Sequence, residues 1–272
     1  MATKHPPPSY PDILNIAQIT IFLWSLITSA VQEIPLLTLI SSFFSVLLFA
    51  VFIIPTRILL YQLRHYLSST SQSQSPSTLQ VAIVGLVHHA FEHFPHTIGR
   101  VFFSEEGSLS YMVSRIGGRQ HFQRHCWKGR NPDNGLEGWW VSPGGNPQNI
   151  RDSDVGILYL HGGGFVMGSP AFYLEVLYKL TCELQLLGFH RPMIFAPVYG
   201  LAPEATFPSQ IQTAARAWEH LQQSSKPGAL LGIAGDSAGG GLATALMLAI
   251  AKGDVDRKPD FATYVDISTK GI

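Results

Sequence analysis

Apolar and charged residues are distributed unevenly along the chain. Residues 13–56 contain Glu33 as their only Asp, Glu, Lys or Arg. The segment 36–54 is almost wholly apolar, and about 20 apolar residues are enough for a helix to cross a bilayer. We therefore predict that residues 13–56 form a membrane anchor, with a transmembrane helix over 36–54 and a second candidate span over 13–31.

Two other interpretations of this apolar segment are a cleaved signal peptide and a buried core helix. A signal peptide has a shorter apolar region nearer the N-terminus, and the length and apolarity of 36–54 disfavour a core helix. Arg57 and Arg64 favour a cytosolic C-terminal side by the positive-inside rule, while Lys4 precedes the segment. The side that the following domain faces stays open, and the anchor is compatible with the endoplasmic reticulum membrane.

The sequence is more polar on both sides of the anchor. Residues 1–12 are rich in proline and are predicted to be a mobile tail. Residues 68–78 read SSTSQSQSPST, the composition of a flexible linker. A helix is predicted from Leu79 to Phe94, ending near Pro95. The whole of 57–135 is interpreted as a linker and a cap-like helical region.

From residue 136 onward, short apolar runs alternate with amphipathic segments. The predicted strands are 139–141, 155–160, 193–196 and 230–234, and the predicted helices are 171–187, 209–223 and 239–251. The first helix is expected to present a stripe of leucines to the core, at Leu177, Leu180, Leu184 and Leu187. Ser209 is expected to cap the second helix. Strands that alternate with helices predict a mostly parallel sheet covered on both faces.

Composition limits the classes of function that the chain could have. The formal net charge is zero and 13% of residues are charged, so the chain has no basic face for nucleic acid. Two cysteines are too few for a disulfide framework and are interpreted as buried thiols. His89, His93 and His96, with Glu92, could bind zinc at this spacing, but a polar helix face is the preferred interpretation. No metal or organic cofactor is expected.

The sequence Gly-Asp-Ser-Ala-Gly-Gly at 235–240 lies between a predicted strand and a predicted helix. This context is typical of a nucleophile elbow, in which Ser237 would occupy a strained turn and expose its hydroxyl. Gly235 and Gly239 would be needed because side chains there would collide with the turn and the neighbouring strand. The helix N-terminus would add a positive dipole. The alternative is a glycine-rich turn with an incidental serine.

The sequence His-Gly-Gly-Gly at 161–164 follows the predicted strand 155–160. Glycines allow backbone N–H groups to turn toward a developing oxyanion, and the expected donors are Gly162, Gly163 and Ala238. His161 is expected to brace this loop through hydrogen bonds. Its place in the loop should keep it away from the Ser237 hydroxyl, which disfavours a role as base.

These motifs carry a family resemblance. His161-Gly-Gly-Gly-Phe165, Tyr199-Gly-Leu-Ala-Pro-Glu204 with Phe207-Pro208, and the elbow at 235–240 occur in the order seen in the hormone-sensitive-lipase-like branch of the α/β-hydrolases. That branch includes bacterial esterases, arylacetamide deacetylases and steryl acetyl hydrolases. The resemblance covers about residues 136–266 and implies a doubly wound, mostly parallel α/β-hydrolase sheet.

The same resemblance implies roles for individual residues. Ser237 would be the nucleophile, and Gly162, Gly163 and Ala238 would form the oxyanion hole. Asp236 would belong to the elbow and would not be the triad acid. Glu204 would hold the loop after the fourth strand. The supporting motif residues are His161, Gly164, Gly235, Asp236, Gly239 and Glu204. Gly200 departs from the family, which usually has arginine there.

The larger departure follows Ser237. Members of this branch take the triad acid and histidine from further along the chain, but the last histidine here is His220. The later aspartates do not match the family's acid position, at Asp254, Asp256, Asp260 and Asp266. We therefore expect residues 136–272 to be a partial hydrolase domain, from an incomplete gene model or a truncation, and to be inactive as given.

The predicted parent function is hydrolysis of lipophilic carboxylic esters, such as acetyl or steryl esters, by a serine nucleophile at a membrane. Two alternatives stay open. One is a catalytically dead ligand-binding protein, because gibberellin receptors resemble this branch and lack the catalytic histidine. The other is a non-functional fragment.

Overall fold

The computed structural model describes residues 16–67, 77–144, 151–253 and 261–264. The expectations for the tail 1–12 and for most of the linker 68–78 lie outside these residues, as do the four late aspartates. The chain divides into two compact units. One unit is Ile27–Val101, and the other comprises Met1–Leu26 and Phe102–Ile272.

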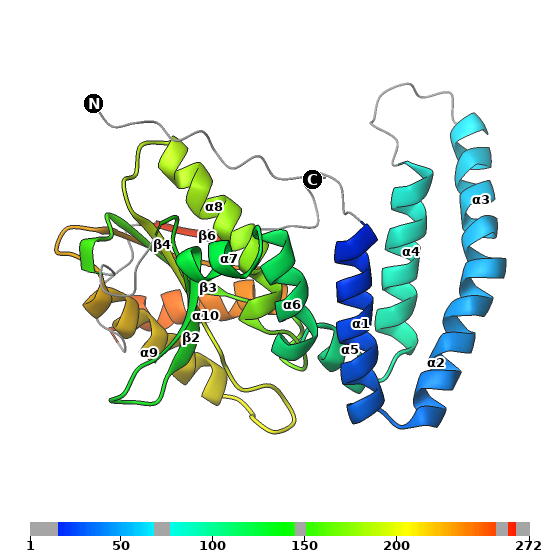
Figure 1. Ribbon diagram of the computed structural model, residues 1–272, viewed down its shortest axis with the longest axis horizontal. Helices are drawn as coiled ribbons and strands as arrows, with labels where there is room; N and C mark the ends of the chain where they lie inside the picture. Colours follow the sequence, from blue (N-terminus) through cyan, green and yellow to red (C-terminus); the bar gives the residue numbers. More distant parts are fainter. Residues whose placement is uncertain (1–15, 68–76, 145–150, 254–260, 265–272) are drawn as a thin grey trace. The chain divides into compact units, whose positions relative to one another are not determined.

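The first unit is helical (Figure 1). Its elements are α1 (Ile16–Glu33), which begins before the unit, α2 (Leu36–Leu48), the π-helical turn η1 (Phe49–Ile53), α3 (Ile54–Leu67), α4 (Thr78–His93) and α5 (His96–Phe102). The predicted helix 36–54 is confirmed as helical, but Pro55 does not end it. The run Leu36–Tyr61 is long and apolar enough to cross a membrane, and 6% of its most apolar 18-residue window is buried.

The π-helical turn explains why the helix continues through Pro55. Proline lacks an N–H group, and in an α-helix its ring clashes with the carbonyl four residues earlier. Here the Ile54 N–H donates to the carbonyl of Phe49, five residues back. This wider turn changes the spacing of the carbonyls ahead of the proline. The Thr56 hydroxyl also donates to the Phe52 carbonyl at 2.6 Å.

The helix predicted over 79–94 is confirmed as α4. A capping box defines its start: the Ser77 N–H donates to Gln80 Oε1 at 2.7 Å, and the Gln80 N–H donates to Ser77 Oγ at 3.2 Å. The helix ends before Pro95, so His96 falls on α5 and not beside His89. Among the described residues, no group of three or more His, Cys, Asp or Glu side chains could hold a metal ion.

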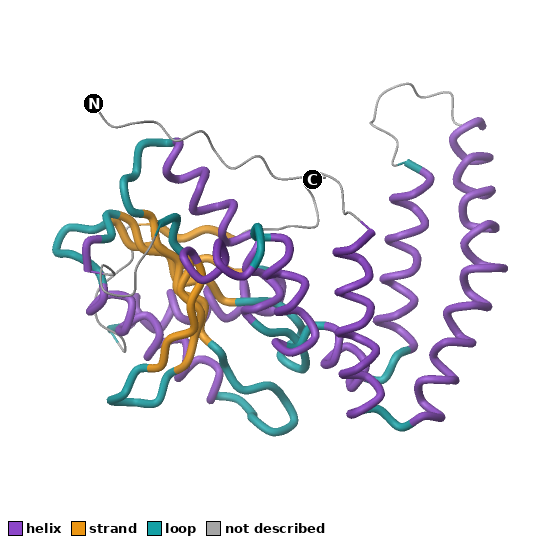
Figure 2. The backbone as a smooth tube through the Cα atoms, viewed as in Figure 1, coloured by secondary structure: helices purple, strands orange, loops and turns teal. Residues whose placement is uncertain are grey.

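The second unit is a sheet between helices (Figure 2). Its strands are β1 (Cys126–Arg130), β2 (Glu137–Val141), β3 (Val155–Leu160), β4 (Pro192–Pro197), β5 (Leu230–Gly235) and β6 (Phe261–Tyr264). Its helices are α6 (Glu105–Arg115), α7 (Arg119–His125), η3 (Pro170–Tyr173), α8 (Leu174–Leu186), α9 (Ser209–Ser224) and α10 (Ser237–Lys252).

The strand order is β1-β2-β4-β3-β5-β6. β4, β3, β5 and β6 are parallel, while β2 is antiparallel to both of its neighbours. The predicted doubly wound, mostly parallel sheet is therefore confirmed. β1 was not predicted, because its stretch was assigned to the linker and cap-like region. Only its first residue, Cys126, is buried, so pairing with β2 defines this strand more than its own apolar pattern does.

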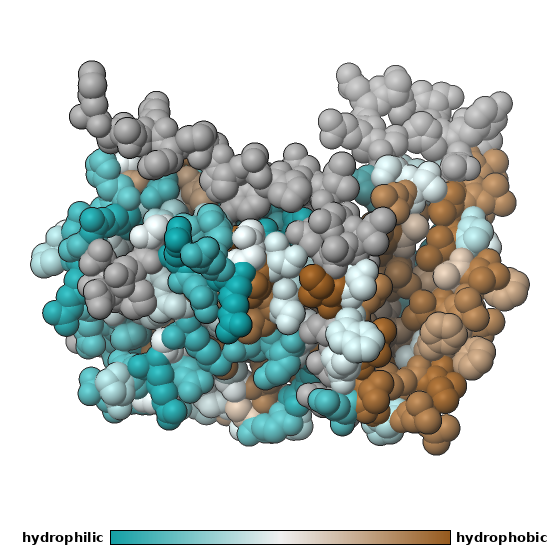
Figure 3. All heavy atoms as spheres, in the orientation of Figure 1, coloured by the Kyte–Doolittle hydropathy of each residue, from teal (hydrophilic) through white to brown (hydrophobic). Residues whose placement is uncertain are grey.

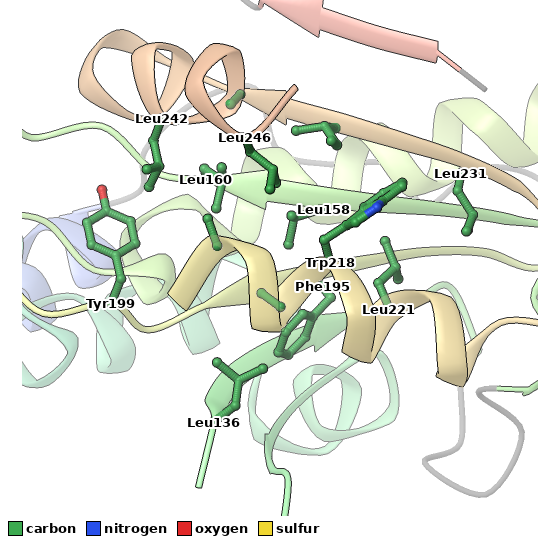
Figure 4. Close-up of a cluster of buried hydrophobic side chains, with 14 of the residues drawn as sticks. Leu136, Leu158, Leu160, Phe195, Tyr199, Trp218, Leu221, Leu231, Leu242 and Leu246 are labelled. Atoms are coloured by element: carbon green, nitrogen blue, oxygen red, sulfur yellow. The ribbon is translucent and has the colours of Figure 1, made fainter. Parts of the chain in front are cut away.

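Two cores cover the two faces of the sheet. The residues of β3 are all buried and alternate between them: Leu158 and Leu160 join one core, and Ile157 and Tyr159 the other. The first core also includes Trp218 and Leu221 of α9 and Leu242 and Leu246 of α10 (Figure 4). The second core includes residues of α7 and α8, at Phe122, Leu174, Leu177 and Tyr178.

Two local predictions were wrong. Leu187 is 78% exposed, because α8 ends at Leu186 and Gly188 reverses the chain at φ 103°. Ser209 does not cap α9 but is its first residue. Its hydroxyl donates back to the Thr206 carbonyl at 2.6 Å, so it closes the preceding turn. Leu177, Leu180 and Leu184 do face the core as predicted.

Candidate active site

Ser237 lies at the junction of β5 and α10. The chain leaves β5 at Gly235, passes through Asp236 in an extended conformation, and turns at Ser237 with φ 48°. A positive φ is uncommon for a residue with a Cβ and places Ser237 in the left-handed region. Ser237 is exposed at the C-terminal end of β5. A serine held in this strained conformation is the geometry expected of a nucleophile elbow.

The two elbow glycines allow α10 to lie directly against β3. A Cβ atom on Gly239 would overlap the carbonyl oxygens of Leu160 and His161. A Cβ on Gly235 would lie 2.5 Å from the Gly239 carbonyl oxygen and 2.8 Å from that of Leu160. The predicted collision at both positions is confirmed. As a result, the start of α10 lies beside the loop that follows β3.

Asp236 connects the elbow to that loop. Its carboxylate accepts three hydrogen bonds: from the Gly162 N–H at 2.8 Å, the Tyr159 hydroxyl at 2.9 Å and the Tyr173 hydroxyl at 3.0 Å. Burial, together with this carboxylate, raises the pKa of both tyrosines. The two phenols therefore keep their protons and act as donors. The Asp236 carboxylate thus accepts hydrogen bonds from β3, from the loop after β3 and from η3.

The contact between Gly162 and Asp236 changes the assignment of the oxyanion donors. Gly162 was expected to direct its N–H at an oxyanion, but this N–H already donates to Asp236. Within the described part of the chain, the N–H groups of Gly163, Gly164 and Ala238 have no protein acceptor. Ala238 is in the first turn of α10, where N–H groups have no intrahelical partner. Among the described residues, the N–H groups of Gly163, Gly164 and Ala238 are therefore without a protein acceptor, while that of Gly162 is engaged.

The loop after β3 has a backbone that few other residues could adopt. Gly163 and Gly164 have φ values of 119° and 65°, in the region that favours glycine. A Cβ on Gly163 would also overlap the Met167 carbonyl oxygen. Phe165 continues the turn with φ 62°.

His161 is buried and bound within its own loop. Its Nδ1 lies 2.7 Å from the Gly162 carbonyl oxygen, to which it donates as Nδ1–H. Its ring stacks on Tyr199 at 4.2 Å, and the Tyr199 hydroxyl donates to the His161 carbonyl at 2.5 Å. Burial lowers the pKa of His161 to about 4. The imidazole is therefore neutral at physiological pH. It contacts its own loop on one side and Tyr199, two residues after β4, on the other.

Two further residues considered in the sequence, Glu204 and His220, lie on other parts of the fold. Glu204 is exposed in the turn between β4 and α9. His220, the last histidine, is on α9, where its Nδ1 lies 3.1 Å from Asn131 Nδ2. Within the described residues, no side chain hydrogen-bonds to the Ser237 hydroxyl.

Sequence reasoning gave no role to four residues that organise the site. Tyr159, Tyr173 and Tyr199 supply the hydroxyl groups described above. Gln210 reaches from α9 and donates to the carbonyls of Gly200 and Ala205 at 3.0 and 2.9 Å. Two signals were available: Tyr199 begins a quoted motif, and Tyr159 stands in an apolar strand two residues before the loop motif.

Part of the chain is similar to known proteins. Residues 157–265 match the family model described as alpha/beta hydrolase fold. An acetyl-hydrolase of Streptomyces hygroscopicus is 32% identical over 113 residues, which cover 41% of this chain and 33% of that protein. Neutral cholesterol ester hydrolase 1 of Mus musculus is 32% identical over 111 residues, which cover 38% of this chain and 26% of that protein. The chain thus spans about a quarter to a third of these relatives.

Solved structures are similar over part of the chain. A hormone-sensitive lipase from a metagenome library is 29% identical, with a TM-score of 0.39, over 48% of this chain and 40% of that one. The crystal structure titled EstE5-PMSF is 26% identical, with a TM-score of 0.47, over 67% of this chain and 56% of that one.

Proposed function

Because residues 157–265 carry the alpha/beta hydrolase fold, we propose that this chain is built for nucleophilic hydrolysis of carboxylic esters, with Ser237 as the nucleophile. The observation that carries the proposal is the exposed Ser237 at φ 48°, next to three backbone N–H groups without protein acceptors. The named relatives are an acetyl-hydrolase and a cholesterol ester hydrolase, which supports ester chemistry.

In the proposed reaction, Ser237 Oγ attacks the acyl carbon of the ester and its proton passes to a base. The carbonyl oxygen becomes an oxyanion, which the N–H groups of Gly163, Gly164 and Ala238 stabilise. Collapse of the tetrahedral intermediate expels the alcohol and leaves an acyl-serine. Water then attacks the acyl-serine, releases the acid and returns the proton to Ser237.

The base is the missing part. No histidine follows Ser237 in the sequence, and His161 is fixed by Gly162 and Tyr199 in its own loop. We propose that the 272-residue chain has a formed elbow and oxyanion hole but does not turn over esters. Binding without turnover, as in a hydrolase-fold receptor, is the second candidate function, and it is supported by the fact that no side chain among the described residues hydrogen-bonds to the Ser237 hydroxyl.

The proposed substrate is a small lipophilic ester such as an acetyl or steryl ester. The cholesterol ester hydrolase among the relatives supports this class. The apolar helix Leu36–Tyr61, of which little is buried, supports attachment to a membrane in which such an ester would dissolve. We propose that this helix is the membrane anchor and that the hydrolase unit acts at the membrane surface.

The test is to supply the missing base from solution. The purified chain in detergent is incubated with p-nitrophenyl acetate, with and without imidazole, and acetyl-Ser237 is measured by peptide mass spectrometry. We expect turnover without imidazole to equal that of Ser237→Ala, and imidazole to produce acetyl-Ser237. The control is acetylation of partly exposed Ser209, which imidazole should not favour.

Three outcomes decide between the alternatives. Acetyl-Ser237 that depends on imidazole supports a hydrolase site without its base. Turnover above Ser237→Ala in the absence of imidazole would show that a base is present and refute the proposed inactivity. Equal labelling of Ser237 and Ser209 under all conditions would refute the assignment of Ser237 as an activated nucleophile.

A further inference from the structure

The helix α4 (Thr78–His93) has an apolar surface that the described residues of its unit leave exposed. Residues 78–91 contain no Asp, Glu, Lys or Arg. Its exposed apolar side chains are Leu79, Ile83, Val84, Leu86, Val87 and Phe91, between 37% and 68% exposed. Figure 3 shows apolar side chains gathered over α2, α3 and α4. Scattered apolar residues on a surface are ordinary, but a contiguous patch of this kind marks an interaction surface.

Specific contacts fix the position of α4 along the neighbouring long helix. The His89 ring stacks on Phe49 with centroids 4.1 Å apart, and His89 Nε2 lies 2.9 Å from Ser45 Oγ. One turn earlier on α4, a Cβ on Gly85 would lie 3.8 Å from Arg57 Nη1 and 3.9 Å from the Phe49 ring. Moving toward the N-terminus of α4 therefore means moving toward the C-terminus of α2–η1–α3.

The other end of α4 confirms this antiparallel register. Phe94, the residue after α4, packs in a small cluster with Ile34 and Leu39, at the start of α2. Since each helical residue rises 1.5 Å, α4 lies alongside roughly residues 40 to 57. That stretch shares residues 40–54 with the segment 36–54 that is predicted to cross the membrane.

From this register we infer that α4 is embedded in the lipid beside α2–α3 and contacts acyl chains through Val84 and Val87. The inference rests on the proposed anchoring of Leu36–Tyr61. If residues 45–57 lie in hydrocarbon, the segment packed against them lies at the same depth. The chain then leaves α4 on the side of the membrane where α2 begins.

The polar groups between the helices fit a nonaqueous setting. His89 is 8% exposed, and its partner Ser45 lies on α2, so these two polar side chains satisfy each other between the helices. The Arg57 guanidinium lies over the Phe49 ring, 5.4 Å from its centroid, an arrangement that attracts a cation to an aromatic face. Gly85 leaves the space for these groups, as small residues do between packed membrane helices.

Spin labels can test this placement in the full chain. Cys126 and Cys182 are replaced by alanine, and single cysteines are introduced at Val87 on α4, Leu48 on α2 and Val176 on α8. The labelled proteins are reconstituted in phosphatidylcholine vesicles. Collision rates are then measured with oxygen, which concentrates in lipid, and with a charged nickel chelate, which stays in water. Val176 is the matched control, because it is 49% exposed and Val87 is 48% exposed.

We expect the oxygen-to-nickel ratio at Val87→Cys to match that at Leu48→Cys, and to exceed that at Val176→Cys by about tenfold, because a charged chelate is excluded from hydrocarbon. A ratio at Val87→Cys equal to that at Val176→Cys, with Leu48→Cys still in lipid, would overturn the inference and leave the anchor intact. Nickel access at both Val87→Cys and Leu48→Cys would overturn the anchor and the inference together. Low access to both reagents with spin–spin broadening would place a second copy of the chain on α4 instead.

A second measurement needs no substitution. A carbene reagent that partitions into lipid is activated on the unmodified chain in the same vesicles, and the modified peptides are identified. We expect modification within 78–91 and within Leu36–Tyr61, and none within α8. Modification confined to Leu36–Tyr61 would contradict the inference even if the cysteine variants do not fold.

Discussion

The Gly162 N–H donates to Asp236 Oδ1 at 2.8 Å and so joins the loop after β3 to the elbow after β5. Gly162 and Asp236 are 74 positions apart in the sequence. Their contact fixes which N–H groups of the loop remain available above Ser237. It also makes the Asp236 carboxylate the common acceptor of the loop after β3 and of the hydroxyl groups of Tyr159 and Tyr173.

Replacing Asp236 tests this common acceptor. Asp236→Ala leaves the Gly162 N–H and two tyrosine hydroxyls without their acceptor, and we expect the free energy of unfolding to fall by about 3 kcal/mol. Asp236→Asn keeps one acceptor oxygen and should lose less. Chemical unfolding in detergent, monitored by near-UV circular dichroism, gives both free energies of unfolding.

The matched control is Asp152→Asn. Asp152 is exposed and pairs with Arg191 at the surface, so its replacement should change the free energy of unfolding by less than about 1 kcal/mol. An Asp236→Ala protein as stable as Asp152→Asn would show that the buried network contributes nothing.

Two glycines in α10 are expected to respond oppositely to alanine. In Gly239→Ala the new Cβ meets the carbonyl oxygens of Leu160 and His161, so α10 must move away from β3, at an expected loss of about 3 kcal/mol. In Gly241→Ala the Cβ enters open space, and the better helix propensity of alanine should add up to about 1 kcal/mol.

Thermal unfolding of the two alanine variants is the measurement. The difference in sign is the decisive result, because both substitutions are in one helix and add one methyl group. Equal effects would mean that α10 does not lie against β3 as closely as described.

Because Ser237 has a left-handed backbone conformation, we expect its side chain to lower the free energy of unfolding. Ser237→Gly relieves the strain of a Cβ at φ 48°, so the free energy of unfolding should rise by about 1 kcal/mol relative to Ser237→Ala. Ser237→Ala removes the same hydroxyl and keeps the strain, which makes it the reference. A glycine variant less stable than the alanine variant would argue against a strained elbow.

Burial of His161 is expected to make the folded chain less stable in acid. Its pKa is about 4 in the folded chain, lowered from 6.5 by burial. As the pH falls through 6.5 toward 4, the unfolded chain binds a proton that the folded chain does not, so the free energy of unfolding decreases in that window. The size is roughly 3 kcal/mol, because each pKa unit corresponds to about 1.4 kcal/mol.

The comparison with His161→Gln isolates this contribution. Between pH 7 and pH 4 the unsubstituted chain should lose more stability than the glutamine variant, while all other titrating groups contribute to both. Parallel pH profiles for the two proteins would mean that His161 takes up its proton at the same pH in the folded chain as in the unfolded chain.

The sequence by itself determined the elements and the motif chemistry. Apolar runs placed β3, β5 and α4 almost to the residue, and the glycine-rich motifs marked the two loops that follow β3 and β5. Such features are local: they depend on periodicity and on the conformations that single residues can adopt.

Only the tertiary structure decided the features that depend on partners far away in the chain. It engaged the N–H of Gly162 with Asp236. It also placed α4 alongside the apolar helix through His89 and Ser45. None of these follows from a local pattern, because a hydrogen bond between residues 44 or 74 positions apart forms only once the intervening chain has folded.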